Sequence, residues 1–330
     1  MYFAGLDIHK VFTFGVIKDE GGEVLNKAKF ENSEENFESF FKGFLPEETK
    51  VVMESTGVWE YIYEILNSKG YEVKLANPVR TKAIASARIK TDAVDAATLA
   101  DLLRANLIAE SYVPTKEVRR LRDVVRQRKS LVKGRTQIKN KIYSMLIRQG
   151  VKLPYKSLCP SAINWLNDNI DINDVFVSYF NILEQYNNEV KFIEKHLKSM
   201  AEKNEQAKLL TTIPGIGPIT AMVLVAEIAD IKRFPNGEKL CSYAGLVPSI
   251  KQSGNSLKHG RLVKQASKSL KNALVQASWR IVRTKEANTL KLHYLRLKDK
   301  KGKQKAICAT ARKMLCIIHA MLRKNQEFIA

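Results

Sequence analysis

Short hydrophobic runs separated by polar turns fill the first hundred residues, a pattern typical of strands that alternate with helices. Runs at Phe3–Ile8, Thr13–Lys18 and Glu23–Phe30 predict three strands, with Gly21-Gly22 as the turn before the third. The pattern that follows predicts helix, strand, helix, strand and helix in that order, at Glu34–Phe44, Val51–Met53, Tyr61–Ser68, Tyr71–Ala76 and Asp92–Leu103.

Three strands in a meander followed by this alternation is the element order of an α/β ribonuclease-H-like (RuvC-like) domain. Many other α/β domains begin in the same way, so the order favours this fold without singling it out.

Two long helices are predicted in the middle of the chain. The first runs from Thr115 to about Gln149 and is basic, and the second runs from about Asn173 to Lys203, after a break that contains Pro154 and Pro160. Apolar residues recur every three or four positions in both. This pattern is typical of a coiled-coil arm through which chains assemble, and two ordinary packed helices have the same periodicity.

The last part of the chain is predicted to be mostly α-helical. Leu209–Ala221 indicates a helix-hairpin-helix-like element, whose Gly215 and Gly217 would let a phosphate approach the backbone at a helix N-terminus. The alternative is a tight turn with no ligand. Residues 298–305, rich in Lys and Gly, predict an exposed loop before a closing helix at Ala306–Arg323. We divide the chain into an α/β domain (1–112), a basic helical arm (113–206) and a C-terminal domain (207–330).

Charge is distributed unevenly over the 330 residues, whose formal net charge is +21. Residues 1–110 carry a net charge of −5, and the remaining residues carry +26. A surplus of this size indicates a polyanionic partner, because each phosphate that is neutralised releases condensed counterions. Nucleic acid is therefore the favoured partner of the second part.

The cysteines and the apolar runs exclude other classes. Cys159, Cys241, Cys308 and Cys316 form no C-x-x-C pair, which argues against a zinc ribbon and a secreted disulfide framework. We expect them to be small buried residues in a reducing cytoplasm. No run approaches the roughly 20 apolar residues of a membrane helix, and the N-terminus lacks the apolar segment of a signal peptide.

Four carboxylates stand where a metal-dependent nuclease needs them. Asp7 ends the first predicted strand, Glu54 follows the run Val51–Met53, and Asp92 and Asp95 share one face at the start of a helix. Ribonuclease-H-like enzymes use such groups to hold two Mg²⁺ or Mn²⁺ ions about 3.5–4 Å apart. These ions prefer oxygen ligands, and no cluster of His or Cys competes for the role. Each carboxylate alone is unremarkable, and Asp92 would also suit the N-terminus of its helix without a metal.

Several segments resemble one transposase family. Gly5-Leu6-Asp7-Ile8-His9-Lys10, Met53-Glu54-Ser55-Thr56-Gly57, Asn77-Pro78 and Lys90-Thr91-Asp92-Ala93-Val94-Asp95-Ala96 resemble the DEDD domain of the IS-one-ten insertion-sequence transposases, relatives of the Piv-type DNA invertases. The helix with Val118–Arg122 and Arg126–Arg128 resembles the family's coiled coil. Ile213–Pro218, Ser242–Pro248 and Gln252–Gly254 resemble its C-terminal transposase domain.

The resemblance implies a DNA transposase, a site-specific recombinase with a split active site. Asp7, Glu54, Asp92 and Asp95 would be catalytic metal ligands for Mg²⁺, with Mn²⁺ as a substitute, and Ser253 the nucleophile that forms a phosphoserine link to DNA. Members act as oligomers, and several use a structured guide RNA encoded by the element. The expected location is the prokaryotic cytoplasm, at the nucleoid.

Basic residues and turn glycines are the expected nucleic-acid contacts. They are Arg119, Arg120, Arg122, Arg126, Arg128, Gly215, Gly217, Lys258, Arg261 and Lys264. The chain departs from the family pattern after Lys264, where members carry Arg-Gly and further arginines, and this chain has Gln265, Ala266, Lys268 and Lys271. The lysines keep the charge but lack the planar fork of Arg.

Without the family, Ser253 reads as an exposed serine of a polar loop. Two other functions therefore stay open. An endonuclease of the Holliday-junction-resolvase type needs the four carboxylates but not Ser253. A non-catalytic DNA- or RNA-binding protein needs neither, and its binding would not depend on Mg²⁺.

Overall fold

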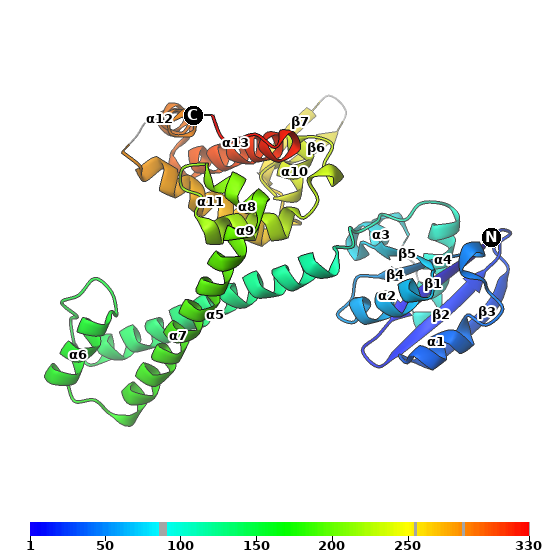
Figure 1. Cartoon of the computed structure of the whole chain (residues 1–330), viewed down its shortest axis with the longest axis horizontal. Coiled ribbons are helices and arrows are strands. Elements are labelled where there is room, and N and C mark those ends of the chain that lie inside the picture. Colours follow the sequence, from blue (N-terminus) through cyan, green and yellow to red (C-terminus); the bar gives the residue numbers. More distant parts are fainter. Residues whose placement is uncertain (86–90, 254–255, 286–287, 330) are drawn as a thin grey trace. The chain divides into compact units, whose positions relative to one another are not determined.

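The computed structural model describes residues 1–85, 91–253, 256–285 and 288–329, with the backbone alone at positions 250, 251, 253, 257 and 259. The chain forms two units, Met1–Val113 and Pro114–Ala330 (Figure 1). Among the described residues, no helix is both long and apolar enough to span a membrane.

The first unit is built on a five-stranded mixed sheet with the order β3-β2-β1-β4-β5. Its strands are β1 (Tyr2–Ile8), β2 (Phe12–Lys18), β3 (Val24–Glu31), β4 (Thr49–Glu54) and β5 (Glu72–Ala76). Strands β1, β2 and β3 form an antiparallel meander, and β4 and β5 continue the sheet in parallel with β1. The five strands follow one another along the chain as the sequence predicts.

Helices cover both faces of this sheet. They are α1 (Glu34–Phe40), α2 (Trp59–Ser68), α3 (Pro78–Ile84) and α4 (Asp92–Arg104), with a 3₁₀ turn η1 (Pro46–Glu48). Val51 and Met53 of β4 pack in the core formed with α1 and α2, whereas Val52 packs in a second cluster with Leu99 of α4. The alternation of side chains along a strand explains this division. Helix α3, which the sequence analysis does not predict, follows directly from Asn77.

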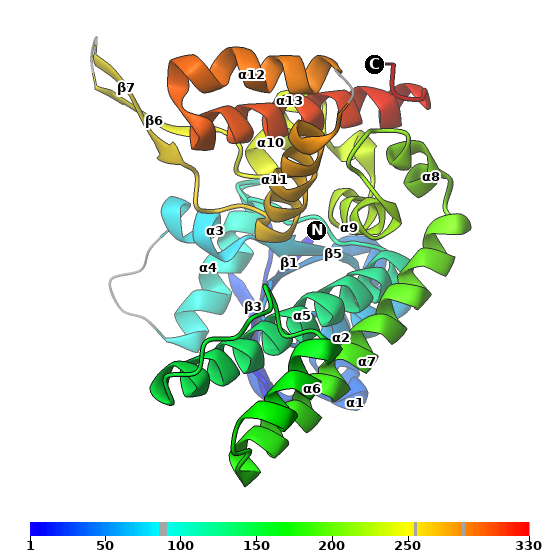
Figure 2. The same cartoon turned by 90° about the vertical axis from the view of Figure 1, so that its left-hand side faces the viewer.

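The second unit begins with a helical hairpin. Helices α5 (Lys116–Arg148) and α7 (Asp174–Glu202) lie side by side and cross, as Figures 1 and 2 show. The two predicted long helices are thus confirmed. The prolines between them do not simply break the chain, because Pro160 starts a further helix, α6 (Pro160–Asn169). Its Leu166 packs with Ile142 of α5 and Leu183 of α7.

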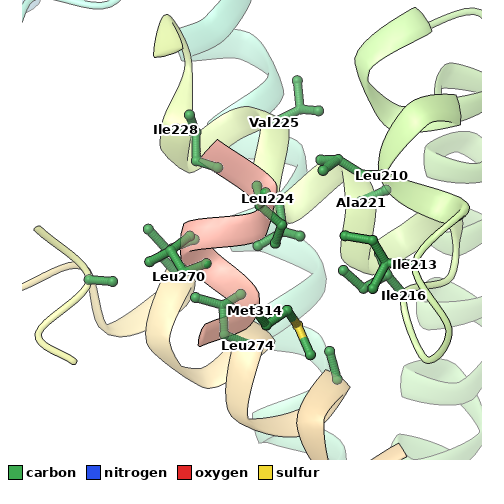
Figure 3. Packing of buried hydrophobic residues seen from close by; sticks show 14 of the residues in the cluster. Leu210, Ile213, Ile216, Ala221, Leu224, Val225, Ile228, Leu270, Leu274 and Met314 are labelled. Carbon is green, nitrogen blue, oxygen red and sulfur yellow. The ribbon is translucent and has the colours of Figure 1, made fainter. Parts of the chain in front are cut away.

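The rest of the second unit is mainly helical around one large apolar core. Its elements are α8 (Glu205–Thr211), α9 (Pro218–Ile228), the 3₁₀ turn η2 (Ile231–Arg233), α10 (Gly237–Tyr243), β6 (Pro248–Ser253), β7 (Ser256–Leu262), α11 (Lys268–Arg283), α12 (Thr289–Lys301) and α13 (Lys303–Lys324). Helix α9 is the centre of this core, where Leu224 lies near Leu270 of α11 and Met314 of α13 (Figure 3).

The predicted loop at 298–305 is wrong. Helix α12 continues to Lys301, and α13 starts at Lys303, so only Gly302 separates them. Tyr294 of α12 packs against Ala306 and Ile307 of α13. This buried contact holds the Lys-rich segment in helices, because packing of an apolar face outweighs composition.

Candidate functional site

Two carboxylates of the first unit lie on neighbouring strands at the same edge of the sheet. Strands β1 and β4 run in parallel with Leu6 paired to Met53, so Asp7 and Glu54 occupy the next positions of the two strands. Adjacent strands lie about 4.8 Å apart, and residues in register share a face. The sequence analysis expects both residues at strand ends, and this is where they lie.

The other two carboxylates belong to the first turn of α4. Asp92 is the first residue of the helix, and the Thr91 hydroxyl caps the helix by accepting a hydrogen bond from the backbone N–H of Val94 at 3.2 Å. Asp92 and Asp95 therefore lie near the positive end of the helix dipole, which favours carboxylates. Since α4 packs on β1, Asp92 comes close to Asp7.

A histidine completes this cluster. His9 Nε2 lies 3.2 Å from Asp7 Oδ2 and 3.5 Å from Asp92 Oδ1. Asp7, His9 and Asp92 each offer one possible ligand atom, and these three atoms lie within 4.8 Å of one another. Among the described residues, this group does not include Glu54 or Asp95. No cluster of His or Cys is expected from the sequence, and His9 is not among the residues predicted for the site. Its spacing of two from Asp7 is the available signal, because such residues share a face of an extended chain.

Burial and nearby negative charge both act on the Asp7 carboxyl. Burial raises the pKa of its carboxyl, and the Asp92 and Asp95 carboxylates raise this pKa further, whereas His9 opposes the rise. A cation at this place would relieve the repulsion. Carboxylate oxygens together with one imidazole nitrogen are ligands that a divalent metal ion accepts. The residues present therefore fit a divalent metal.

A hollow of about 340 Å³ lies beside the cluster. It is lined by Ile8, His9, Lys10, Thr56, Gly57 and Val58. The Thr56 hydroxyl is buried and finds no hydrogen-bond partner among the described residues. A buried polar atom without a partner is costly, so this hydroxyl is available to a ligand group.

Ser253 lies in the second unit, at the end of a two-stranded sheet. It is the last residue of β6 and pairs with Ser256, the first residue of β7. The expectation of a polar loop is therefore wrong for Ser253, because the backbone pairing of a hairpin includes it. Its side chain and Gly254 of the Gln252–Gly254 motif lie outside what the structure describes.

Basic residues line this hairpin. Lys258 and Arg261 on β7 and Lys264 just after it are all exposed. Lys251 and Lys258 hold opposite positions in the strand pair. Exposed positive charge thus lies on β7 and just after it.

The five arginines assigned to nucleic acid on α5 differ in their surroundings. Arg119 is buried and donates to the Pro114 carbonyl. Arg122 donates from Nε to the Ala226 carbonyl at 2.9 Å, at the end of α9, and Arg128 forms an ion pair with Glu194 of α7. These three have roles inside the protein. Arg120 and Arg126 are exposed, and nucleic-acid contact stays a prediction for all five.

The predicted helix pair around Gly215 and Gly217 is present as α8, a turn and α9. Gly215 has φ +86, and a Cβ added there would lie 2.8 Å from Ile281 Cγ1, so packing against α11 explains this glycine. Gly217 caps α9, and a Cβ there would meet nothing within 4 Å. Packing thus does not explain Gly217, and its contact with a phosphate stays a prediction.

Comparison with known proteins identifies the class of enzyme. A family model for DEDD transposases of the IS110 (IS-one-ten) type, described as "Transposase", matches residues 4–149. A second, described as "Transposase IS116/IS110/IS902 family", matches residues 207–294. The first match includes Asp7, Glu54, Asp92 and Asp95, and the second includes Ser253.

Individual relatives agree with these matches. The transposase for insertion sequence element IS1111A of Coxiella burnetii is 26% identical over 290 residues, which cover 84% of this chain and 79% of that protein. The pilin gene-inverting protein of Moraxella bovis is 29% identical over 285 residues, 84% of this chain and 81% of that protein. The chain belongs to the IS110 family of transposases, enzymes that cleave and rejoin DNA.

Proposed function

We propose that this chain recombines the DNA of its own insertion sequence through a serine nucleophile, with a metal-binding ribonuclease-H-like domain as its second catalytic part. The observation that carries the proposal is the meeting of Asp7 and Asp92, 85 positions apart in the sequence, at the edge of the sheet where Glu54 also ends its strand. The order of domain (1–112), arm (113–206) and serine domain (207–330) is part of the proposal.

Asp7, Glu54, Asp92 and Asp95 are proposed to hold Mg²⁺, with Mn²⁺ as a substitute. When bound, the metal supplies positive charge against the phosphodiester oxygens. The residues of the chain fix where this charge lies, because β1 and β4 hold two of the carboxylates and α4 the other two. The hollow beside His9 gives a phosphodiester room to approach.

Ser253 is proposed to attack a DNA phosphorus atom through its Oγ. The new bond is Oγ–P, and the bond that breaks joins phosphorus to a deoxyribose oxygen. A base takes the serine proton, and a proton is delivered to the departing oxygen, so the sugar leaves as a hydroxyl. The strand stays attached as a phosphoserine, and attack by another deoxyribose hydroxyl rejoins it. Covalent attachment keeps the energy of the phosphodiester, which hydrolysis would lose.

DNA and a structured guide RNA are the proposed partners, and the enzyme is proposed to act as a homo-oligomer in the cytoplasm, at the nucleoid. The net charge of +26 beyond residue 110 supports a polyanionic partner. The exposed Lys258 and Arg261 of β7 and Lys264 just after it support DNA at the hairpin that contains Ser253.

A covalent adduct tests the proposal. Purified protein is incubated with labelled element-end DNA, element RNA and Mg²⁺, and denaturing gels then separate free DNA from DNA bound to protein. We expect an adduct that is absent from Ser253→Ala, from Asp7→Asn and from samples with EDTA. Cleavage without an adduct in the parent and in Ser253→Ala would instead establish the resolvase-type function. Binding without cleavage would contradict both.

A further inference from the structure

His9 lies in the metal-binding cluster although it is not one of the four carboxylates. We propose that His9 is a direct ligand of the divalent metal through Nε2, and that this nitrogen raises the affinity of the site for Mn²⁺ more than its affinity for Mg²⁺. The inference rests on the proposed metal role of Asp7 and Asp92 and adds a residue and an ion preference to it.

The distances between the donor atoms fit a shared ion. Nε2 of His9 lies 3.2 Å from Asp7 Oδ2 and 3.5 Å from Asp92 Oδ1. Two ligands about 2.1 Å from an octahedral ion and at right angles to each other lie about 3 Å apart. Nε2 of His9 is thus spaced from each carboxylate oxygen almost like a neighbouring ligand on one ion, and the three residues each offer a ligand atom within 4.8 Å of the others.

The backbone and ring of His9 are held in place before any ion binds. Its N–H donates to the Phe12 carbonyl at 2.9 Å, and its own carbonyl accepts from Asn32 Nδ2 at 2.8 Å. The imidazole stacks on the Phe12 ring, with centroids 4.5 Å apart and an interplanar angle of 25°. A ligand that is already oriented loses little conformational freedom on binding a metal.

The cluster also has access to solvent. The side chains of His9 and Asp92 are 41% and 43% exposed, whereas that of Asp7 is 16% exposed. Divalent ions of this kind keep several waters, so a site with one open side suits them. His9 also lines the hollow, together with Thr56.

The choice of donor atoms determines the expected ion preference. Mg²⁺ is a hard ion and takes oxygen ligands almost exclusively, whereas Mn²⁺ lies further along the series of ions that accept imidazole. A nitrogen in the first coordination sphere therefore benefits Mn²⁺ more than Mg²⁺. In a competing arrangement, His9 only bridges the two carboxylates in the metal-free protein and leaves when the ion enters.

Electron spin-echo envelope modulation of bound Mn²⁺ distinguishes these arrangements. The full-length protein is loaded with less than one equivalent of Mn²⁺, once with natural histidine and once with ¹⁵N-histidine. We expect a nitrogen coupling that changes with the isotope, disappears in His9→Asn and persists in His196→Asn. His196 is an exposed histidine of α7 and serves as the matched control.

Three other outcomes would overturn either the role of His9 or the proposed metal function. Bound Mn²⁺ without a nitrogen coupling would overturn the role of His9 and leave the proposed metal function intact. A coupling that persists in His9→Asn would assign it to another histidine and also overturn the inference. If the parent protein binds no Mn²⁺, the proposed metal function itself fails, and this result is separate from the other two.

Metal affinities give a second measurement that does not depend on the spectra. Asparagine keeps a polar side chain with a hard oxygen donor at position 9. In His9→Asn we expect the dissociation constant for Mn²⁺ to rise about 10-fold or more, and that for Mg²⁺ to change less than about 3-fold. Equal losses for both ions would contradict the preference, and circular dichroism checks that the variant is folded.

Discussion

Gly5 of β1 lies so close to Ala96 of α4 that a Cβ added to the glycine would stand 2.1 Å from the Ala96 carbonyl oxygen. The same atom would stand 2.6 Å from the backbone nitrogen of Ala100. Both neighbours are backbone atoms of a helix and cannot move aside as a side chain can. The missing side chain at Gly5 thus sets how closely α4 approaches β1, and with it the distance from Asp92 to Asp7.

Gly5→Ala should therefore displace α4. We expect it to lower the free energy of unfolding by about 3 kcal/mol, the upper end for overpacking, and to weaken Mn²⁺ binding because Asp92 moves away from Asp7. Chemical denaturation and a metal titration measure the two effects. Gly57→Ala is the stability control, because a Cβ there meets nothing within 4 Å. Unchanged stability of Gly5→Ala would show that α4 does not need this close contact.

An ion pair also fastens α4 to the sheet. Lys18 Nζ of β2 lies 2.7 Å from Asp101 Oδ2, and the side chains are 10% and 45% exposed. Asp101→Asn leaves a buried ammonium without its carboxylate and should cost about 2 kcal/mol, less than for fully buried pairs. Lys18→Met removes the buried charge and should cost less than about 1 kcal/mol. Thermal unfolding measures the stability of the two variants. An equal loss of stability in Asp101→Asn and Lys18→Met would contradict this expected difference.

The arginines of α5 should separate into two groups. Arg122→Ala removes the donors to the Ala226 and Glu227 carbonyls and should lower stability by about 1–3 kcal/mol. Arg126→Ala should change the free energy of unfolding by less than about 0.5 kcal/mol. It should weaken DNA binding, and the slope of log K for DNA against log salt concentration should become shallower by about one. Melting curves measure the stability of both variants, and DNA titrations at several salt concentrations measure their DNA binding. Loss of stability in Arg126→Ala would contradict the division.

Cys241 should resist alkylation. Burial, together with the Cys316 thiol 3.7 Å away, raises the pKa of the Cys241 thiol to about 12. A raised pKa means that less reactive thiolate is present at any given pH, so labelling should be slow at pH 8 and gain speed until the pH approaches 12. Mass spectrometry after iodoacetamide treatment should find Cys159 and Cys308, which are partly exposed, modified first. Early labelling of Cys241 in the folded protein would contradict its burial.

The local pattern of the sequence was sufficient for the strands of the first unit, for its helices other than α3, and for the two long helices. Alternation along β1 and β4 and the capped start of α4 put Asp7, Glu54 and Asp92 at element ends, because each signal lies within a few residues of its carboxylate. His9 needed the fold, since its second partner, Asp92, is far away in sequence. The family model covers the same carboxylates but does not test their role.

Other features depend on contacts that local patterns do not contain. The β6–β7 hairpin is rich in Ser and Lys, so its polar sequence reads as a loop although the backbones pair. The α12–α13 boundary is set by Tyr294 and Ile307 packing across a Lys-rich turn. Arg122 reads as a DNA contact because its partner, the Ala226 carbonyl, lies 104 positions away.

Mapping the covalent adduct to a residue tests the serine mechanism most directly. After nuclease treatment and trypsin digestion, the peptide Gln252–Lys258 contains two serines, Ser253 and Ser256. Fragmentation in the mass spectrometer separates them, with Ser256→Ala as the matched control protein. We predict a phosphate or nucleotide on Ser253 that forms only with DNA and a divalent metal and persists in Ser256→Ala. A modification on another residue, or DNA cleavage with no modified peptide, would contradict the mechanism.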